Sequence, residues 1–143
     1  MIAGITVILA PDNIESDAKK ITSMENYLTI GIFIGLVQVL EGYLLLRASG
    51  KINIYSSVTS FIEFGWVIAT VYYLVNYDFS TPGLAIASAY LSYNILGWIK
   101  SKQLMNNLET TEDIIHITIP KPFAVAAMLF GTVYSAACLL ALQ

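Results

Sequence analysis

The sequence predicts an all-α membrane protein, an antiparallel bundle of four transmembrane helices that forms a single integral membrane domain over residues 1–143. Two observations predict this fold class. Hydrophobic residues make up 57% of the chain and charged residues only 12%, about half of the roughly 25% that is usual in soluble domains. The apolar residues also form four long stretches, and a helix of about 20 such residues crosses about 30 Å of hydrocarbon.

Each predicted span has its own signal in the sequence. The first is closed by Arg47, and the second has Glu63 as its only charged side chain. The third is the shortest and ends before Lys100, and the fourth has no charged side chain. Pro82 and Pro122 lie near the starts of the last two, where a missing N–H is harmless. We therefore expect helices over about residues 27–46, 54–75, 82–99 and 123–142.

Aromatic residues near the predicted helix ends are typical of a belt at the membrane–water interface. We assign to this belt Tyr27, Tyr77, Trp98 and Phe123.

Two segments remain outside the predicted spans. Residues 1–10 form a short apolar N-terminal segment that is too short to cross the membrane. The residues that follow, beginning with Pro11, break this segment. Because it is apolar and yet does not span, we expect it to lie against a partner chain or on the lipid surface. Residues 102–120 form a polar loop between the third and fourth helices. Its strand-like end, Ile-Ile-His-Ile-Thr-Ile, suits pairing with a neighbouring chain.

The basic residues predict the orientation in the membrane. Five of them lie near one set of helix ends: Arg47, Lys51, Lys100, Lys102 and Lys121. The other side has only two, both in the N-terminal region, together with five acidic residues. Because basic loops stay on the cytoplasmic side, loops 47–53 and 100–121 are predicted to be cytoplasmic. Both termini would then lie outside the cell membrane.

Four polar side chains lie at membrane depth. Glu41 lies about 9 Å inside Arg47, and Glu63 about 14 Å inside the start of its helix, at about 1.5 Å per residue. Gln38 reaches the depth of Glu63, and Asn94 reaches the depth of Glu41. Ionisable groups are costly in the bilayer and usually face protein or water. We therefore expect these four residues to form a candidate ion or proton site between the helices.

Small residues predict where the helices pack. Gly31 and Gly35 have the spacing that lets two helix backbones approach closely. Gly42 continues the same stripe, and Gly131 is its counterpart on the fourth helix.

The two glutamates allow three interpretations. Glu63 can be protonated or hydrogen-bonded by Gln38 and Thr59, so that the polar stripe only holds helices together. Alternatively, Glu41 and Glu63 alternately bind a proton or cation on a transport path. In the third interpretation, a glutamate pairs with a basic residue of another subunit.

Other chemistries lack the residues that they need. The chain has one histidine, His116, and one cysteine, Cys138, whereas metal sites need clusters of such ligands. We expect His116 to be a solvated loop residue and Cys138 to be a packing residue. No histidine or lysine at helix depth is available to activate a nucleophile. The sequence therefore predicts no metal, no cofactor and no catalytic residue, and the chain is not expected to be an enzyme.

Two functions remain for a small membrane protein of this composition. The first is a non-catalytic structural or accessory subunit of a larger membrane protein complex, and this is the one that we expect. The alternative is a small homo-oligomeric transporter or channel that uses Glu41 and Glu63 for proton or cation coupling. The partners are then the lipid bilayer and other membrane subunits or further copies of the chain. A nucleic-acid partner is excluded by the formal charge of −3.

Overall fold

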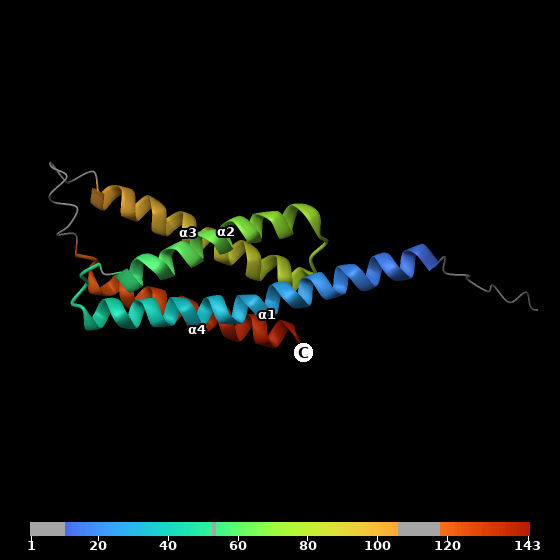
Figure 1. Cartoon of the computed structure of the whole chain (residues 1–143), viewed down its shortest axis with the longest axis horizontal. Helices are drawn as coiled ribbons and strands as arrows, with labels where there is room; N and C mark the ends of the chain where they lie inside the picture. Colours follow the sequence, from blue (N-terminus) through green and yellow to red (C-terminus); the bar gives the residue numbers. More distant parts are fainter. Residues whose placement is uncertain (1–10, 53, 106–117) are drawn as a thin grey trace, which may run out of the picture.

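The structure of the chain is a computed structural model that describes residues 11–52, 54–105 and 118–143, with side chains for residues 23–52, 54–103 and 118–143. This part of the chain forms four helices: α1 (Pro11–Arg47), α2 (Ile54–Asn76), α3 (Thr81–Met105) and α4 (Lys121–Ala141). Consecutive helices run in opposite directions along the long axis of the molecule (Figure 1). The described residues contain no strand, only an isolated antiparallel bridge between Lys51 and Thr118. The predicted all-α class is confirmed for this part of the chain.

Three of the four helices are long and apolar enough to cross a membrane, within the described residues. They are the stretch Ser23–Arg47 of α1, all of α2 and all of α4. The prediction of membrane helices is confirmed for these three. It is not confirmed for α3, because Ser88, Ser92 and Asn94 interrupt its apolar residues. The length of α3, 25 residues, suits a span, but within the described residues it is not as apolar as the spans Ser23–Arg47, α2 and α4.

Helix α1 begins at Pro11, so the predicted start near residue 27 is wrong. Proline suits the first position of a helix because its missing N–H needs no partner there. The sequence-based boundary marked only the point where the helix becomes apolar. Figure 1 shows the polar part of α1 projecting past the other three helices.

The other helix ends lie close to the predicted ones. Helices α2 and α4 agree within two residues, whereas α3 continues to Met105, beyond the predicted end at residue 99. The predicted apolar segment 1–10 and residues 106–117 of the predicted loop, with His116, lie outside the described residues. Thr118 forms an isolated bridge with Lys51 of the same chain; pairing of the strand-like segment with a neighbouring chain stays a prediction, because most of that segment lies outside the described residues.

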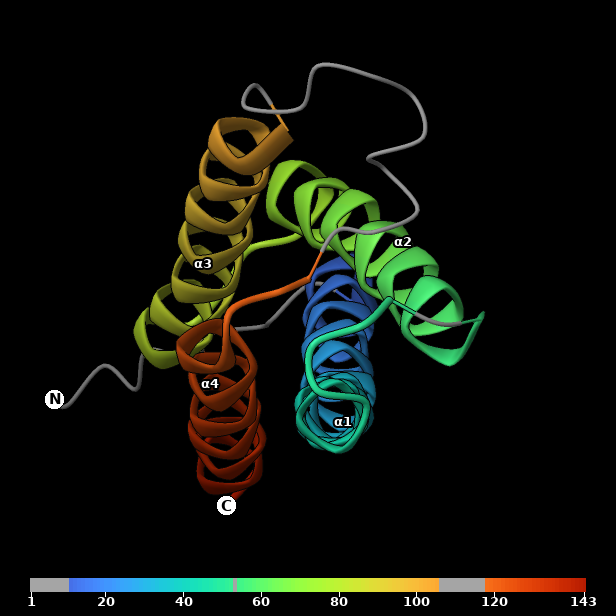
Figure 2. The ribbon, with the colours of Figure 1, turned by 90° about the vertical axis from the view of Figure 1, so that its left-hand side faces the viewer.

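The helices follow one another around the bundle in chain order, and α4 closes against α1 (Figure 2). A Schellman motif ends α1: Gly50 N donates to Leu45 O at 2.7 Å, and Ser49 N donates to Leu46 O at 3.2 Å. Gly50 has a φ of +82°, and its carbonyl oxygen accepts a hydrogen bond from Ile119 N at 2.9 Å. This bond ties the end of α1 to the start of α4.

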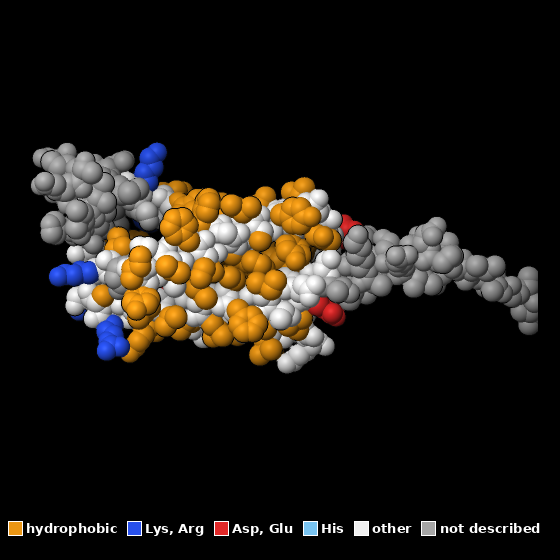
Figure 3. Space-filling view, in the orientation of Figure 1, with side chains coloured by type: hydrophobic (Ala, Val, Ile, Leu, Met, Phe, Trp, Pro, Cys, Tyr) orange, Lys and Arg blue, Asp and Glu red, His pale blue; other side chains and the backbone are white. Residues whose placement is uncertain are grey.

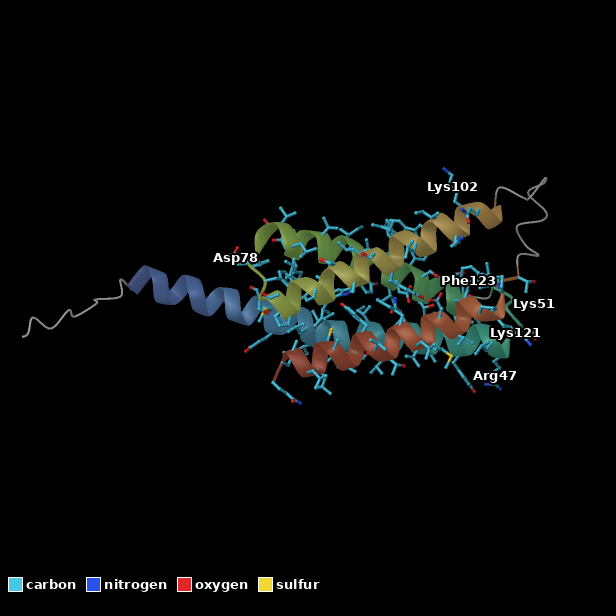
Figure 4. The ribbon with its side chains drawn as sticks, turned by 180° about the vertical axis from the view of Figure 1, so that it is seen from behind. Arg47, Lys51, Asp78, Lys102, Lys121 and Phe123 are labelled. Carbon is cyan, nitrogen blue, oxygen red and sulfur yellow. The ribbon has the colours of Figure 1, made fainter. Side chains whose placement is uncertain are left out.

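The surface has the charge distribution of a membrane protein. Hydrophobic side chains cover the middle of the visible face, with Lys and Arg at one end and Asp and Glu at the other (Figure 3). Figure 4 places Arg47, Lys51, Lys102 and Lys121 together at one end and Asp78 at the opposite end. These are called the basic end and the acidic end below.

Buried aromatic side chains form much of the core. Tyr27 and Tyr90 are fully buried, and Trp66 and Tyr134 are nearly so. The assignment of Tyr27 to an interfacial belt is therefore wrong, because α1 continues past Tyr27 and turns its side chain into the bundle. The other three belt residues differ from it: Trp98 and Phe123 are exposed and Tyr77 is half-buried.

Candidate functional site

Close contact between α1 and α4 positions the polar site. A Cβ atom built on Gly35 would lie 2.6 Å from Gly131 O, and one built on Gly131 would also clash with Gly35 O. A Cβ on Gly42 would lie 2.5 Å from Ala124 O. Real Cβ atoms do not approach so closely, so only glycine permits this approach. Gly31 lies on the same stripe, beside Cys138, where an added Cβ would lie 2.8 Å from the sulfur.

The two membrane glutamates lie beside each other at the junction of α1 and α2. Glu41 and Glu63 are both half-buried and lie within electrostatic range of each other. Ser60 Oγ donates a hydrogen bond to Glu41 Oε1 at 3.0 Å. Two carboxylates so close cannot both remain charged without a neighbouring proton or cation. The pair is therefore suited to binding one positive charge.

Gln38 is the third member of the site. It is fully buried and lies next to Glu63. Neither its amide nitrogen nor its amide oxygen has a hydrogen-bond partner among the described residues, and the same holds for Glu63 Oε1. An unpaired buried polar group costs about 1–3 kcal/mol. Three such atoms at one place indicate a site at which a group other than the described side chains supplies the missing hydrogen bonds.

Thr59 does not supply the missing hydrogen bond. Its hydroxyl donates instead to Ser56 O, at 3.0 Å on the same helix. The predicted hydrogen bond from Thr59 to Glu63 is therefore absent from the structure.

Helix α3 brings two further polar side chains to the glutamates. Tyr90 OH donates a hydrogen bond to the backbone oxygen of Glu63 at 3.2 Å. Asn94 is buried, and its Nδ2 donates to Tyr90 O at 3.0 Å. The structure thus gathers all four predicted polar residues of the membrane region into one site, with Gln38 at Glu63 and Asn94 one turn beyond Tyr90.

A hollow of about 440 Å³ adjoins this site. Glu41, Glu63 and Asn94 line it together with Lys100 and residues from the start of α4. A second hollow of about 360 Å³ lies along α2, and Glu41 lines this one too. Because Lys100 belongs to the basic end, the larger hollow leads from that end towards the carboxylates.

A second polar cluster lies nearer the acidic end, and sequence reasoning missed it. Tyr27 OH lies 3.3 Å from Thr70 Oγ1 and 3.4 Å from Tyr134 OH. Trp66 Nε1 donates to Tyr134 OH at 3.1 Å. We call these four residues the hydroxyl cluster. The only available signal was the presence of uncharged hydroxyl groups within apolar helices, which is too common to single out a residue.

No group of three His, Cys, Asp or Glu side chains that could hold a metal ion occurs among the described residues. Cys138 is a free, buried cysteine packed beside Gly31.

Comparison of the chain with models of protein families, with curated proteins and with solved structures finds no match. The three apolar helices are compatible with an integral membrane protein. Its particular function has to be inferred from the polar site and the chemistry that this site can perform.

Proposed function

We propose that the protein crosses the membrane four times, as an antiparallel bundle in which α3 spans together with α1, α2 and α4. Helix α3 has 25 residues, about 37 Å at about 1.5 Å per residue. It runs between the same two ends of the molecule as α2 (Figure 1). Tyr90 and Asn94 are buried in the bundle and Tyr93 is half-buried, which reduces their exposure to lipid. The basic end faces the cytoplasm and both termini lie outside, by the positive-inside rule.

We propose that the protein is a small transporter or channel that binds a proton or a small monovalent cation at Glu63. Of the two functions expected from the sequence, this is the one that the geometry favours. The observation that carries it is the set of unpaired buried atoms, Glu63 Oε1 and both polar atoms of Gln38, beside a second carboxylate. A proton on Glu63, or a cation between it and Gln38, would pair these atoms.

The surroundings of the site support the same function. The larger hollow gives the carboxylates a route from the basic end. Glu41 lines both hollows and lies closer to Arg47, so it is the first acid that an ion meets. A purely structural role for Glu63 is less well supported, because Thr59 bonds to Ser56 O and the amide atoms of Gln38 are unpaired, so neither side chain holds the carboxylate in place.

Ion flux into proteoliposomes tests this function. The purified protein is reconstituted, and proton, Na⁺ and K⁺ fluxes are measured separately for wild type, Glu63→Gln and Glu25→Gln. Glu25 is an exposed carboxylate on the same helix as Glu41 but away from the site, so it is the matched control. Flux of one ion should be present in wild type and the control and lost in Glu63→Gln. Flux no greater than in protein-free vesicles, or equal flux in all three proteins, would contradict the proposal.

The accessory-subunit function is a second candidate, favoured by the exposed face of α3. This face presents small and polar side chains at helical spacing: Ala85, Ser88, Ala89 and Ser92. Such a face suits another transmembrane helix better than it suits lipid. Native purification in mild detergent tests this candidate. Discrete co-purifying membrane proteins that are lost in Ala89→Leu would support it, and purification as the chain alone would contradict it. Neither candidate assigns a chemical reaction to the chain itself.

A further inference from the structure

The hydroxyl cluster continues the polar site towards the acidic end of the bundle. Its four members come from α1, α2 and α4, and each is buried. Tyr27 OH stands between Thr70 Oγ1 at 3.3 Å and Tyr134 OH at 3.4 Å. Either atom of each pair can be the donor, so both hydrogen bonds can reverse their direction.

Tyr90 joins this cluster to Glu63. Its ring packs against the ring of Tyr134 with 5.0 Å between centroids. Its hydroxyl donates to Glu63 O at 3.2 Å and lies within electrostatic range of the Glu63 carboxylate and of Tyr27. Trp66, which donates to Tyr134 OH, lies one helical turn after Glu63 on α2. Tyr90 therefore lies between Glu63 and the hydroxyl cluster, and its hydroxyl must turn away from Glu63 O to exchange a proton with the carboxylate or with Tyr134.

The two polar clusters together extend across much of the membrane. From Glu41 to Tyr27 the distance along α1 is about 21 Å at about 1.5 Å per residue, compared with about 30 Å of hydrocarbon. At the far end, the ring of Tyr27 packs against Phe79 with 5.1 Å between centroids. Phe79 follows the exposed Asp78, which belongs to the acidic end.

We propose that the ion carried by this protein is the proton, and that the hydroxyls of Tyr90, Tyr134, Tyr27 and Thr70 relay it between Glu63 and the acidic end. This inference rests on the proposed function and names the ion that passes through the same site. Hydroxyl oxygens 3.3–3.4 Å apart leave no room between them for a hydrated cation. A proton needs no such room, because it moves by exchange along hydrogen bonds.

Each transfer conserves protons and electrons. A hydroxyl accepts a proton on its oxygen lone pair and releases its own proton to the next oxygen, so it stays a neutral hydroxyl. The Glu63 carboxylate takes up a proton from the larger hollow and releases it to Tyr90, which returns Glu63 to the carboxylate. At the far end the last hydroxyl releases its proton to water at the acidic end. The hydroxyls then turn back before the next proton arrives, and no oxidant or reductant is involved.

Proteoliposomes with a pH-sensitive dye inside test the relay. Tyr27→Phe and Tyr134→Phe each keep the aromatic ring and remove one hydroxyl. Thr70→Val removes the last hydroxyl with little change of shape. Tyr73→Phe is the matched control: its ring lies 5.3 Å from that of Tyr27, but its hydroxyl is not part of the cluster. Size-exclusion chromatography in detergent confirms that each variant is folded before reconstitution.

Voltage-driven proton flux should fall by about tenfold or more in Tyr27→Phe and Tyr134→Phe, a smaller effect than the roughly 10²–10⁴-fold that a positioned proton-transfer group contributes to catalysis. Thr70→Val should reduce flux as well, and Tyr73→Phe should leave it unchanged. Flux that depends on Glu63 but is unchanged in all three cluster variants would overturn the relay and leave the proposed function standing. Flux of Na⁺ or K⁺ without proton flux would overturn the choice of ion. The absence of any Glu63-dependent flux would overturn both proposals.

Discussion

Replacement of Gly35 by alanine is predicted to separate α1 from α4. The added Cβ would lie 2.6 Å from Gly131 O and 3.0 Å from Ser135 N, and it would also clash with Ser135 Oγ. Two of these three atoms belong to the backbone of α4, which cannot rotate away as the end of a flexible side chain can. The helices must therefore move apart by about 0.8 Å to restore an ordinary contact of 3.4 Å.

The expected loss of stability follows from two opposing effects. Overfilling a well-packed contact costs about 1–3 kcal/mol, whereas alanine in place of glycine stabilises a helix by up to about 1 kcal/mol. The clash is with backbone atoms of α4, which cannot move aside alone, so the first effect should prevail. We expect Gly35→Ala to lower the free energy of unfolding by about 1–2 kcal/mol.

Unfolding of the detergent-solubilised protein by SDS, followed by circular dichroism, measures this change. Gly65→Ala and Gly97→Ala are matched controls, because a Cβ on either glycine would have nothing within 4 Å. They lie in α2 and α3 and should be neutral or slightly stabilising. Equal stability changes for Gly35→Ala and the two controls would refute the close contact between α1 and α4.

Three further predictions concern other parts of the molecule. Gln38→Leu removes unpaired buried atoms, so it should stabilise the protein by about 1–3 kcal/mol in the same assay. It should also reduce ion flux, and a loss of stability would contradict the unpaired state of the amide. Gly50→Ala should destabilise by about 1–2 kcal/mol, the cost of a left-handed backbone for a residue with a Cβ, and a neutral effect would contradict the φ of +82°. In a Cys138→Ala background, a membrane-impermeant maleimide applied to intact cells should label Asp78→Cys and leave Ser49→Cys unlabelled; the reverse pattern would invert the proposed orientation.

The apolar lengths in the sequence predicted most of the helices. The ends of α2 and α4 agree closely with prediction, because both helices end near the point where the apolar stretch ends. The start of α1 was missed since its first turns are polar, and hydropathy cannot distinguish a polar helix from a loop. The limited hydropathy of α3 was overlooked because its length alone suits a membrane span.

The candidate site was predictable only in part. Glu41 and Glu63 stand out in the sequence because a charged residue within an apolar helix is rare. The unpaired state of Gln38 was not predictable, since it depends on which side chains the packed helices bring to its amide. The pairing of Tyr27 with Tyr134 joins residues 107 positions apart, and no local pattern indicates such a contact.

The central claim is that Glu63 carries protons through the membrane, and the initial rate of voltage-driven proton flux in proteoliposomes tests it most directly. Vesicles with equal amounts of wild type, Glu25→Gln and Glu63→Gln are compared at the same membrane potential. Equal rates are predicted for wild type and Glu25→Gln, with a fall of about tenfold or more in Glu63→Gln. A Glu63→Gln rate equal to that of wild type would contradict the claim.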